Sequence, residues 1–484
     1  MRRLAAAAAA TFLALAGSAV TASAATPFAP NDPLAPRQWY LQQDHAFDFW
    51  PSTLPTLPGA GVKVAVIDSG IDGTHPDLVG RIAAAKSFVG GSPLTDEQGH
   101  GTFVAGEIAA STNNGVGIAG IAFPARLVIA KVVRADRGIP LEAETAAIRW
   151  AVAQGARVIN LSLGGLRDPT DPLRDTYSQL EASAVDYAVA HGAVVVAAVG
   201  NSDQAPRMPW PYASYPAALP HVIGVSALAR DGSVPLFSDR DPVFNDIAAP
   251  GQEIFSTLPR HLTADRRTCA DQGYSDCGSD DYLHASGTSF AAPQVAAAAA
   301  LLLASDPTLT PDQVSAILER TADDANASNG CRRCPLLRDS LTGWGRLNIA
   351  NALAALAGPL PPADRYETND DAGSHAFTIW GATIRVPATI DYWDDPIDVY
   401  RTRVRAGQRV TLTVRGPGRA DTDLALWKPG TQTVLGAARP LANAGGPGAS
   451  KRITYRAKAG GWYFVEVKLG SAGFGQYTLT ITKR

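Results

Sequence analysis

The sequence predicts an α/β protein with a parallel sheet and helices on both faces, followed by a small all-β sandwich. Between 59 and 357, short apolar runs alternate with helical stretches, a pattern typical of a parallel sheet whose strands are buried on both sides. Farther along, the pattern changes to short alternating strands punctuated by glycine, as in a β-sandwich. With 484 residues, of which 46% are hydrophobic and 18% charged, the chain has enough apolar material for more than one core.

The N-terminal segment is predicted to direct export. Residues 1–24 have a basic start, an apolar middle and the small-residue end Ala22-Ser23-Ala24, which predicts a secretory signal peptide cleaved after Ala24. The alternative is an uncleaved anchor helix. We therefore expect a protein secreted to the extracellular or cell-envelope space, with no membrane attachment after cleavage. Residues 25–58 are polar and Pro-rich with aromatic clusters, and are expected to form an arm that packs over the next domain.

Residues 59–357 carry the predicted parallel sheet. Five apolar runs are expected as its strands: 62–68, 126–133, 156–163, 193–200 and 221–228. Helices are expected after His100, around 141–153, around 176–191 and across 287–304. Parallel sheets carry their functional sites at the carboxyl ends of the strands. Asp68 and Ser162 fall at such ends, and Asn201 lies just past one.

Ser289 stands where a flexible Ser-Gly-Thr approach meets the Ala/Leu-rich run 287–304. Unbonded backbone N–H groups and the helix dipole favour negative charge there, so a hydroxyl nucleophile would have an oxyanion stabilised beside it. Taken alone, the residue is better explained as a helix N-cap.

Three further segments change that interpretation, each placing a polar side chain beside glycine. They are Asp68 in VIDSGID, His100 in GHGTFVAG and Asn201 in AAVGN. A nucleophilic serine needs an imidazole to take its proton, and the imidazole needs a carboxylate to fix its tautomer. An asparagine amide can donate to the developing oxyanion. Alone, Asp68 and Asn201 would be turn residues and His100 a structural histidine; together they predict nucleophilic hydrolysis.

These motifs resemble those of the subtilisin-like serine proteases, the subtilases. The order Asp, His, Ser is that of subtilisin, and further segments of the chain fit the family: HPDL at 75–78, NLSLGG at 160–165, AAPG at 248–251 and GWGRLN at 343–348. The resemblance covers roughly 37–357. It implies a subtilisin-like fold and a serine endopeptidase that acts on proteins or peptides and requires no cofactor for catalysis.

The resemblance also implies a role for each residue. Asp68 orients His100, which serves as general base and then general acid for the nucleophile Ser289. Asn201 and the Ser289 backbone N–H form the oxyanion hole. Ser162, Leu163 and Gly164 pair with an extended substrate as an added strand. Phe290 stands where the family usually has Met, and a similar packing role is expected. Residues 25–36 are too few for a folded propeptide, so unaided folding or an unusual activation is expected.

The linker at 358–366 and the domain at 367–484 follow. This domain resembles the bacterial pre-peptidase C-terminal β-sandwich, whose members are associated with secretion or localisation and with removal. Its predicted strands lie in 398–416, 421–430, 462–470 and 475–484. The carboxylates of Asp370, Asp371, Asp398 and Asp423 are a candidate set of oxygen ligands for structural Ca²⁺, with solvated turn acids as the alternative; calcium ligands in the protease domain are not assigned.

Four cysteines, Cys269, Cys277, Cys331 and Cys334, allow three disulfide pairings. Proximity favours Cys269–Cys277 with Cys331–Cys334. A zinc site is the alternative, although the Cys-x2-Cys at 331–334 has no matching second pair.

Two other function classes compete with a protease. A catalytically inactive binding protein is disfavoured by the intact set of four polar residues, and an esterase by the lack of a Gly-x-Ser-x-Gly elbow around Ser289. The net charge of −3 gives no reason to expect nucleic-acid partners, and a monomer is expected. The acidic insertion 260–284 is expected to border the substrate cleft and to favour basic residues.

Overall fold

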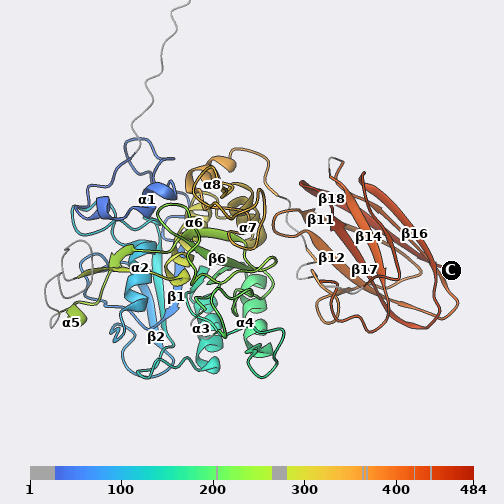
Figure 1. The fold of residues 1–484 in the computed structure, drawn as a ribbon, viewed down its shortest axis with the longest axis horizontal. Helices are drawn as coiled ribbons and strands as arrows, with labels where there is room; N and C mark the ends of the chain where they lie inside the picture. The colour runs from blue at the N-terminus through green and yellow to red at the C-terminus, as the bar shows by residue number, and fades with distance from the viewer. Residues whose placement is uncertain are drawn as a thin grey trace, which may run out of the picture.

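The computed structural model describes residues 28–202, 205–263, 281–361, 365–366, 369–418, 420–435 and 439–484. Two units lie side by side in Figure 1, one that runs from the N-terminal residues to α8 and an all-β unit coloured orange to red. The predicted signal peptide lies outside the described residues, and so does the part of the insertion at 264–280.

A seven-stranded parallel sheet forms the centre of the first unit, in the order β2-β3-β1-β4-β5-β6-β7. Its strands are β1 (Lys63–Asp68), β2 (Ile82–Ser87), β3 (Arg126–Lys131), β4 (Ala156–Leu161), β5 (Val194–Ala198), β6 (Val222–Leu228) and β7 (Ile247–Pro250). The predicted α/β class is therefore confirmed. The edge strands β2 and β7 were not predicted, because β2 is half-exposed and Ala-rich and β7 is only four residues long.

Alternate residues of β1 face the two helical layers, as the twofold period of a strand requires. Val64 and Val66 belong to the cluster with α2, α6, α7 and α8, whereas Ala65 and Ile67 belong to the cluster with α3 and α4. The helices are η1 (Ala35–Arg37), α1 (Tyr40–Gln43), α2 (His100–Ala109), α3 (Leu141–Ala153), α4 (Gln179–Ala190), α5 (Arg260–Thr263), η3 (Thr288–Phe290), α6 (Ala292–Ser305), α7 (Pro311–Arg320) and α8 (Ile349–Ala355).

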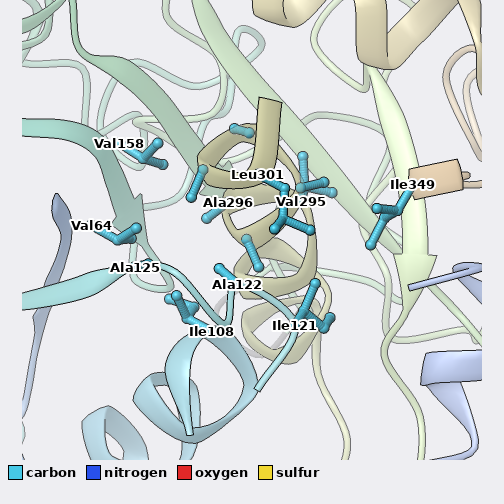
Figure 2. Packing of buried hydrophobic residues seen from close by; sticks show 14 of the residues in the cluster. Val64, Ile108, Ile121, Ala122, Ala125, Val158, Val295, Ala296, Leu301 and Ile349 are labelled. Carbon is cyan, nitrogen blue, oxygen red and sulfur yellow. The ribbon is translucent and has the colours of Figure 1, made fainter. Parts of the chain in front are cut away.

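Helix α6 is the central helix of the core. Figure 2 shows Val295, Ala296 and Leu301 of this helix packed among side chains of β1, β4 and α2. The stretch Thr288–Ser305 is apolar and long enough to cross a membrane, but 89% of it is buried inside the protein. Its composition is therefore that of a core helix. Small alanine side chains let it pack closely against the sheet.

The residues of the predicted arm also join this core. Tyr40, Phe47 and Trp50 are buried in the same cluster as α6. The Gln38 side chain bonds both the carbonyl and the N–H of Ala119, each at 2.8 Å. Described residues of the arm are thus fixed by packing and by hydrogen bonds to distant loops.

The second unit is built from two facing antiparallel sheets, which confirms the predicted β-sandwich class. One sheet has the order β10-β12-β17-β14-β15 and the other β11-β18-β13-β16; the short β10 pairs parallel with β12. The strands are β10 (Phe377–Thr378), β11 (Thr383–Asp391), β12 (Ile397–Val404), β13 (Arg409–Arg415), β14 (Thr422–Trp427), β15 (Ala442–Ala444), β16 (Ser450–Arg456), β17 (Gly461–Leu469) and β18 (Phe474–Lys483). A separate pair, β8 (Ile254–Thr257) and β9 (Tyr282–Ala285), lies in the first unit.

Cys331 and Cys334 form a disulfide with their Cα atoms 5.4 Å apart. This confirms one half of the favoured pairing and rules out the alternative in which these sulfurs bind zinc. The other predicted pair, Cys269–Cys277, lies outside the described residues.

The structure does not support the proposed calcium ligand set. Asp371 accepts the Val434 N–H at 2.6 Å and Asp423 accepts the Gly446 N–H at 3.1 Å. Asp398 accepts the Asn369 amide at 2.6 Å, and Asp370 pairs with His221. Within the described ranges, no group of three or more His, Cys, Asp or Glu side chains is arranged to hold a metal ion. The four carboxylates bond separate partners: Asp398 lies in β12, Asp423 lies in β14, and Asp370 and Asp371 precede β10.

Candidate active site

Strand β1 ends at Asp68 and helix α2 begins at His100, and the two side chains meet. Nδ1 of His100 lies 2.9 Å from both carboxylate oxygens of Asp68. Asp68 is 2% exposed, and its Oδ1 also accepts the Ser69 N–H at 2.7 Å. A buried carboxylate held in this way fixes the histidine tautomer with the proton on Nδ1, which leaves Nε2 as the basic nitrogen.

A polar network fixes the start of α2 against the end of β1. Asp96 is fully buried and accepts the Ser69 hydroxyl at 2.7 Å and the N–H and hydroxyl of Thr102 at 2.9 and 2.7 Å. The Ser69 hydroxyl in turn accepts the Gly101 N–H at 2.9 Å. This network caps the helix and positions His100, because its members flank both Asp68 and His100 in the sequence.

The electrostatics of His100 are a balance of two opposing effects. Burial lowers the pKa of the imidazole, and the adjacent Asp68 charge and hydrogen bond raise it, with the result that the pKa lies above its ordinary value of 6.5. The side chain is still 32% exposed. The Asp68 carboxylate therefore favours the protonated imidazole, as is needed when a general base takes up a proton.

Ser289 lies in the short helix η3, immediately before α6. Its hydroxyl donates to the Ser162 carbonyl at 3.3 Å, and the Ser162 hydroxyl donates to the Ser289 carbonyl at 2.7 Å. The neighbouring Phe290 ring lies 5.4 Å from the His100 ring and 4.5 Å from the Phe103 ring, centre to centre. Phe290 therefore has a packing role, as predicted, and holds η3 against the His100 imidazole.

Asn201 follows β5 and is oriented by Thr288. Its Oδ1 accepts the Thr288 N–H at 2.8 Å and the Thr288 hydroxyl at 2.9 Å. The Gly200 N–H donates to the same hydroxyl at 3.3 Å. Because Oδ1 is used in these bonds, the amide NH₂ is the end of the side chain that is available as a donor.

A cavity of about 180 Å³ lies beside these groups and is lined by both Ser289 and Asn201. Leu163 and Gly164 form part of its wall. The segment that follows β4 is held by a bridge in which Gly165 and Tyr215 exchange two hydrogen bonds of 2.9 Å. The structure thus brings together all seven residues singled out in the sequence, from five separate segments.

The sequence alone did not identify two residues of this arrangement. Thr288, in the same tripeptide as Ser289, orients the Asn201 amide, and Asp96 holds the two segments that carry Asp68 and His100. Asp96 is separated by two residues from Gly99, the residue directly before α2. A carboxylate in the loop just before a predicted helix was therefore a signal that could have identified Asp96 as a group that binds the helix N-terminus.

The comparison with known proteins agrees with this geometry. A family model described as "Subtilase family" matches residues 59–345, more than half of the chain. The chain belongs to the subtilase family. It is a serine protease of that family, with the fold and the order of motifs that the sequence resemblance implied.

Several relatives align with more than half of the chain. The chain is 35% identical over 299 residues to thermitase of Thermoactinomyces vulgaris, an alignment that spans 61% of this chain and 92% of thermitase. It is 36% identical to subtilisin E of Bacillus subtilis, over 58% of this chain and 70% of that protein. A solved structure of a Pseudoalteromonas arctica protease matches with a TM-score of 0.52 and 28% identity, covering 67% of this chain and 99% of the other.

Proposed function

We propose that this subtilase is a secreted serine endopeptidase that uses Asp68, His100 and Ser289 as its catalytic residues. The proposal rests above all on one observation: His100 contacts the buried Asp68 carboxylate through Nδ1 at 2.9 Å, while its ring lies against Phe290, the residue next to Ser289. The proposed reaction uses only groups of the protein and water, so no cofactor is required for catalysis.

In the proposed reaction, Nε2 of His100 takes the hydroxyl proton of Ser289 as Oγ attacks the carbonyl carbon of the peptide bond. The negative charge passes to the carbonyl oxygen, where the Asn201 amide and the Ser289 backbone N–H donate to it. His100 then gives its proton to the leaving amine, and the C–N bond breaks. Water, activated by the same imidazole, hydrolyses the acyl-serine ester and restores the hydroxyl.

The substrate is proposed to bind as an extended strand along Ser162, Leu163 and Gly164. Leu163 and Gly164 line the cavity beside the nucleophile, and an added strand makes backbone hydrogen bonds that do not depend on sequence. In the present arrangement Ser289 donates to the Ser162 carbonyl instead of to His100. Catalytic hydrogen bonds commonly tighten only when substrate is bound.

The test is labelling and hydrolysis by a matched pair of variants. Ser289→Ala is expected to abolish both labelling by a fluorophosphonate and cleavage of an unfolded protein substrate. Ser286→Ala removes a neighbouring serine that bonds the Glu253 N–H, and is expected to keep both. Labelling that persists in Ser289→Ala would contradict the proposed nucleophile.

Export and oligomeric state are part of the same proposal. The basic, apolar and small-residue pattern of residues 1–24 supports export and cleavage after Ala24. N-terminal sequencing of the protein collected outside expressing cells is expected to begin at Ala25, and size-exclusion chromatography to give a monomer. Accumulation of the full-length chain in the membrane fraction would instead indicate an uncleaved anchor.

A further inference from the structure

The lining of the cavity beside Ser289 includes a buried carboxylate, Asp239, that the proposed catalytic roles do not use. Part of the cavity wall comes from glycine and apolar residues, namely Leu163, Gly164, Gly165, Leu166, Ala198 and Ala205. Its polar side chains beyond the proposed catalytic groups include Ser202, Ser214 and Asp239. Asp239 is 1% exposed, so the cavity is the place where another molecule could meet it.

Asp239 reaches the cavity from a loop that follows β6 and is fixed under the Asn201 turn. Its backbone N–H donates to the Gly200 carbonyl at 3.0 Å. Its Oδ1 accepts the Ser202 hydroxyl at 2.6 Å, and that hydroxyl accepts the Trp210 N–H at 3.1 Å. The carboxylate therefore has a set orientation, held by the same turn that carries Asn201.

Because Gly200 has no side chain, the Asp239 carboxylate can lie directly against its backbone. A Cβ atom on Gly200 would lie 2.2 Å from Oδ2 of Asp239 and 2.5 Å from the Ser214 hydroxyl. The residue has a φ of +109°, a conformation that favours glycine. The missing side chain thus leaves the Asp239 carboxylate and the Ser214 hydroxyl side by side at the cavity.

The Asp239 carboxylate would discriminate between apolar and cationic side chains of a substrate. An apolar side chain that filled the cavity would displace water from a buried carboxylate and offer no hydrogen bond in return. An ammonium or guanidinium group would make charge-assisted hydrogen bonds with the carboxylate, and its aliphatic stem would pack against the apolar residues of the wall, such as Leu163 and Leu166.

We propose that Asp239 is a specificity-determining residue that selects Lys or Arg at the substrate residue whose carbonyl Ser289 attacks. This proposal rests on the proposed function, because the cavity is lined by the proposed nucleophile Ser289 and the proposed oxyanion donor Asn201. The sequence predicts a preference for basic residues from a different segment, the acidic insertion 260–284, of which 264–280 lies outside the described residues.

The experiment compares peptides that differ only at that substrate residue: Lys against norleucine, and Arg against citrulline. Citrulline keeps the shape of Arg and removes the charge, and norleucine keeps the aliphatic stem of Lys without its ammonium group. The wild-type enzyme is expected to cleave the cationic peptides with a kcat/KM at least about 30-fold higher. Asp239→Asn is expected to reduce this ratio to about 3-fold or less while still cleaving the norleucine peptide. Asp231→Asn, at an exposed turn acid bonded to Ser233, is the control and is expected to keep the wild-type ratio.

Equal cleavage of cationic and neutral peptides by the wild type would overturn the role of Asp239 and leave the proposed hydrolysis intact. A ratio unchanged in Asp239→Asn would overturn it as well. Failure of the wild type to cleave any peptide would instead contradict the proposed function. If Asp239→Asn does not fold, benzamidine tests the wild type directly: inhibition by this amidinium and not by neutral benzamide supports the proposal, and equal inhibition by both overturns it.

Discussion

Asn201 is held by Thr288 through two hydrogen bonds to one oxygen, and this fixes the direction of its NH₂ group. Asn201→Ala is expected to lower kcat by about 100- to 1,000-fold, since an oxyanion donor contributes about 3–4 kcal/mol to transition-state stabilisation. KM should change little, because the bond forms only as charge develops. Steady-state kinetics on a peptide substrate provide the measurement. A fall in kcat/KM that comes from KM alone would show that Asn201 binds the ground state instead.

The His100–Asp68 pair predicts a pH profile. Asp68 raises the pKa of His100 above 6.5 in spite of burial, and the proposed general base must be neutral. The value of kcat/KM should therefore fall on the acid side of a pKa above 6.5. In Asp68→Asn the charge is lost, so the apparent pKa should move down and the rate should drop by about 10⁴-fold. A profile with the same midpoint in both proteins would exclude His100 as the titrating group.

At the scale of elements, helix α2 can reach β1 only because residue 101 is glycine. A Cβ on Gly101 would lie 2.2 Å from the Gly70 carbonyl and 3.1 Å from Cβ of Asp68. Gly101→Ala should push α2 away from β1, at a cost of about 1–3 kcal/mol in the free energy of unfolding. It should also lower kcat, because His100 begins the same helix.

Urea unfolding measures the predicted loss of stability in Gly101→Ala, and peptide hydrolysis measures the predicted loss of kcat. Gly358→Ala is the matched control, since its new Cβ would meet only the Ala355 carbonyl at an ordinary 3.5 Å; neither stability nor rate should fall. Full activity in Gly101→Ala would show that the α2–β1 contact tolerates displacement without moving the imidazole.

At the scale of the whole molecule, a buried histidine joins the two units. His221, just before β6, is 3.1 Å from Asp312 of α7 through Nδ1 and 3.1 Å from Asp370 of the second unit through Nε2. A bond from the Trp344 indole to the Trp393 carbonyl, 3.1 Å long, adds a second contact across the units. The units therefore dock through specific polar contacts.

The charged groups around His221 make this contact depend on pH. Burial lowers the pKa of His221, but the Asp370 charge and the bonds to both carboxylates raise it well above 6.5. Electrostatic interactions also link this histidine to Asp394 and Asp186, and Asp186 in turn to His375. Because the folded-state pKa is raised, the stabilisation is complete below the unfolded value of about 6.5 and is lost as pH rises through the folded-state pKa.

His221→Gln is expected to remove this pH-dependent stabilisation, which we estimate at about 3 kcal/mol from the cost of breaking a buried ion pair. Limited proteolysis of the linker between the units, run at pH 6 and at pH 9.5, reports the docking. Wild type should be more protected at pH 6, and the variant should be cut at similar rates at both pH values. His191→Gln, at the exposed C-terminus of α4, should behave like wild type. An equal pH response in His221→Gln would assign the effect to the surrounding carboxylates.

The sequence by itself determined the fold class, the central strands and the seven candidate site residues. Those features are encoded locally: buried parallel strands are continuous apolar runs, and the polar residues at their ends are flanked by glycine. The weak edges of the sheet were not predictable in this way. β2 is half-exposed and Ala-rich, so it lacks the strong pattern of the central strands.

Only the tertiary structure decided which side chains meet. It paired Thr288 with Asn201, placed Asp239 beneath Gly200, and joined His221 to Asp370 across the units. It also gave separate partners to the four acids of the second unit that were a candidate set of calcium ligands. The physical reason is the same in each case: a short hydrogen bond between distant segments depends on strand register and packing, which no local pattern of residues contains.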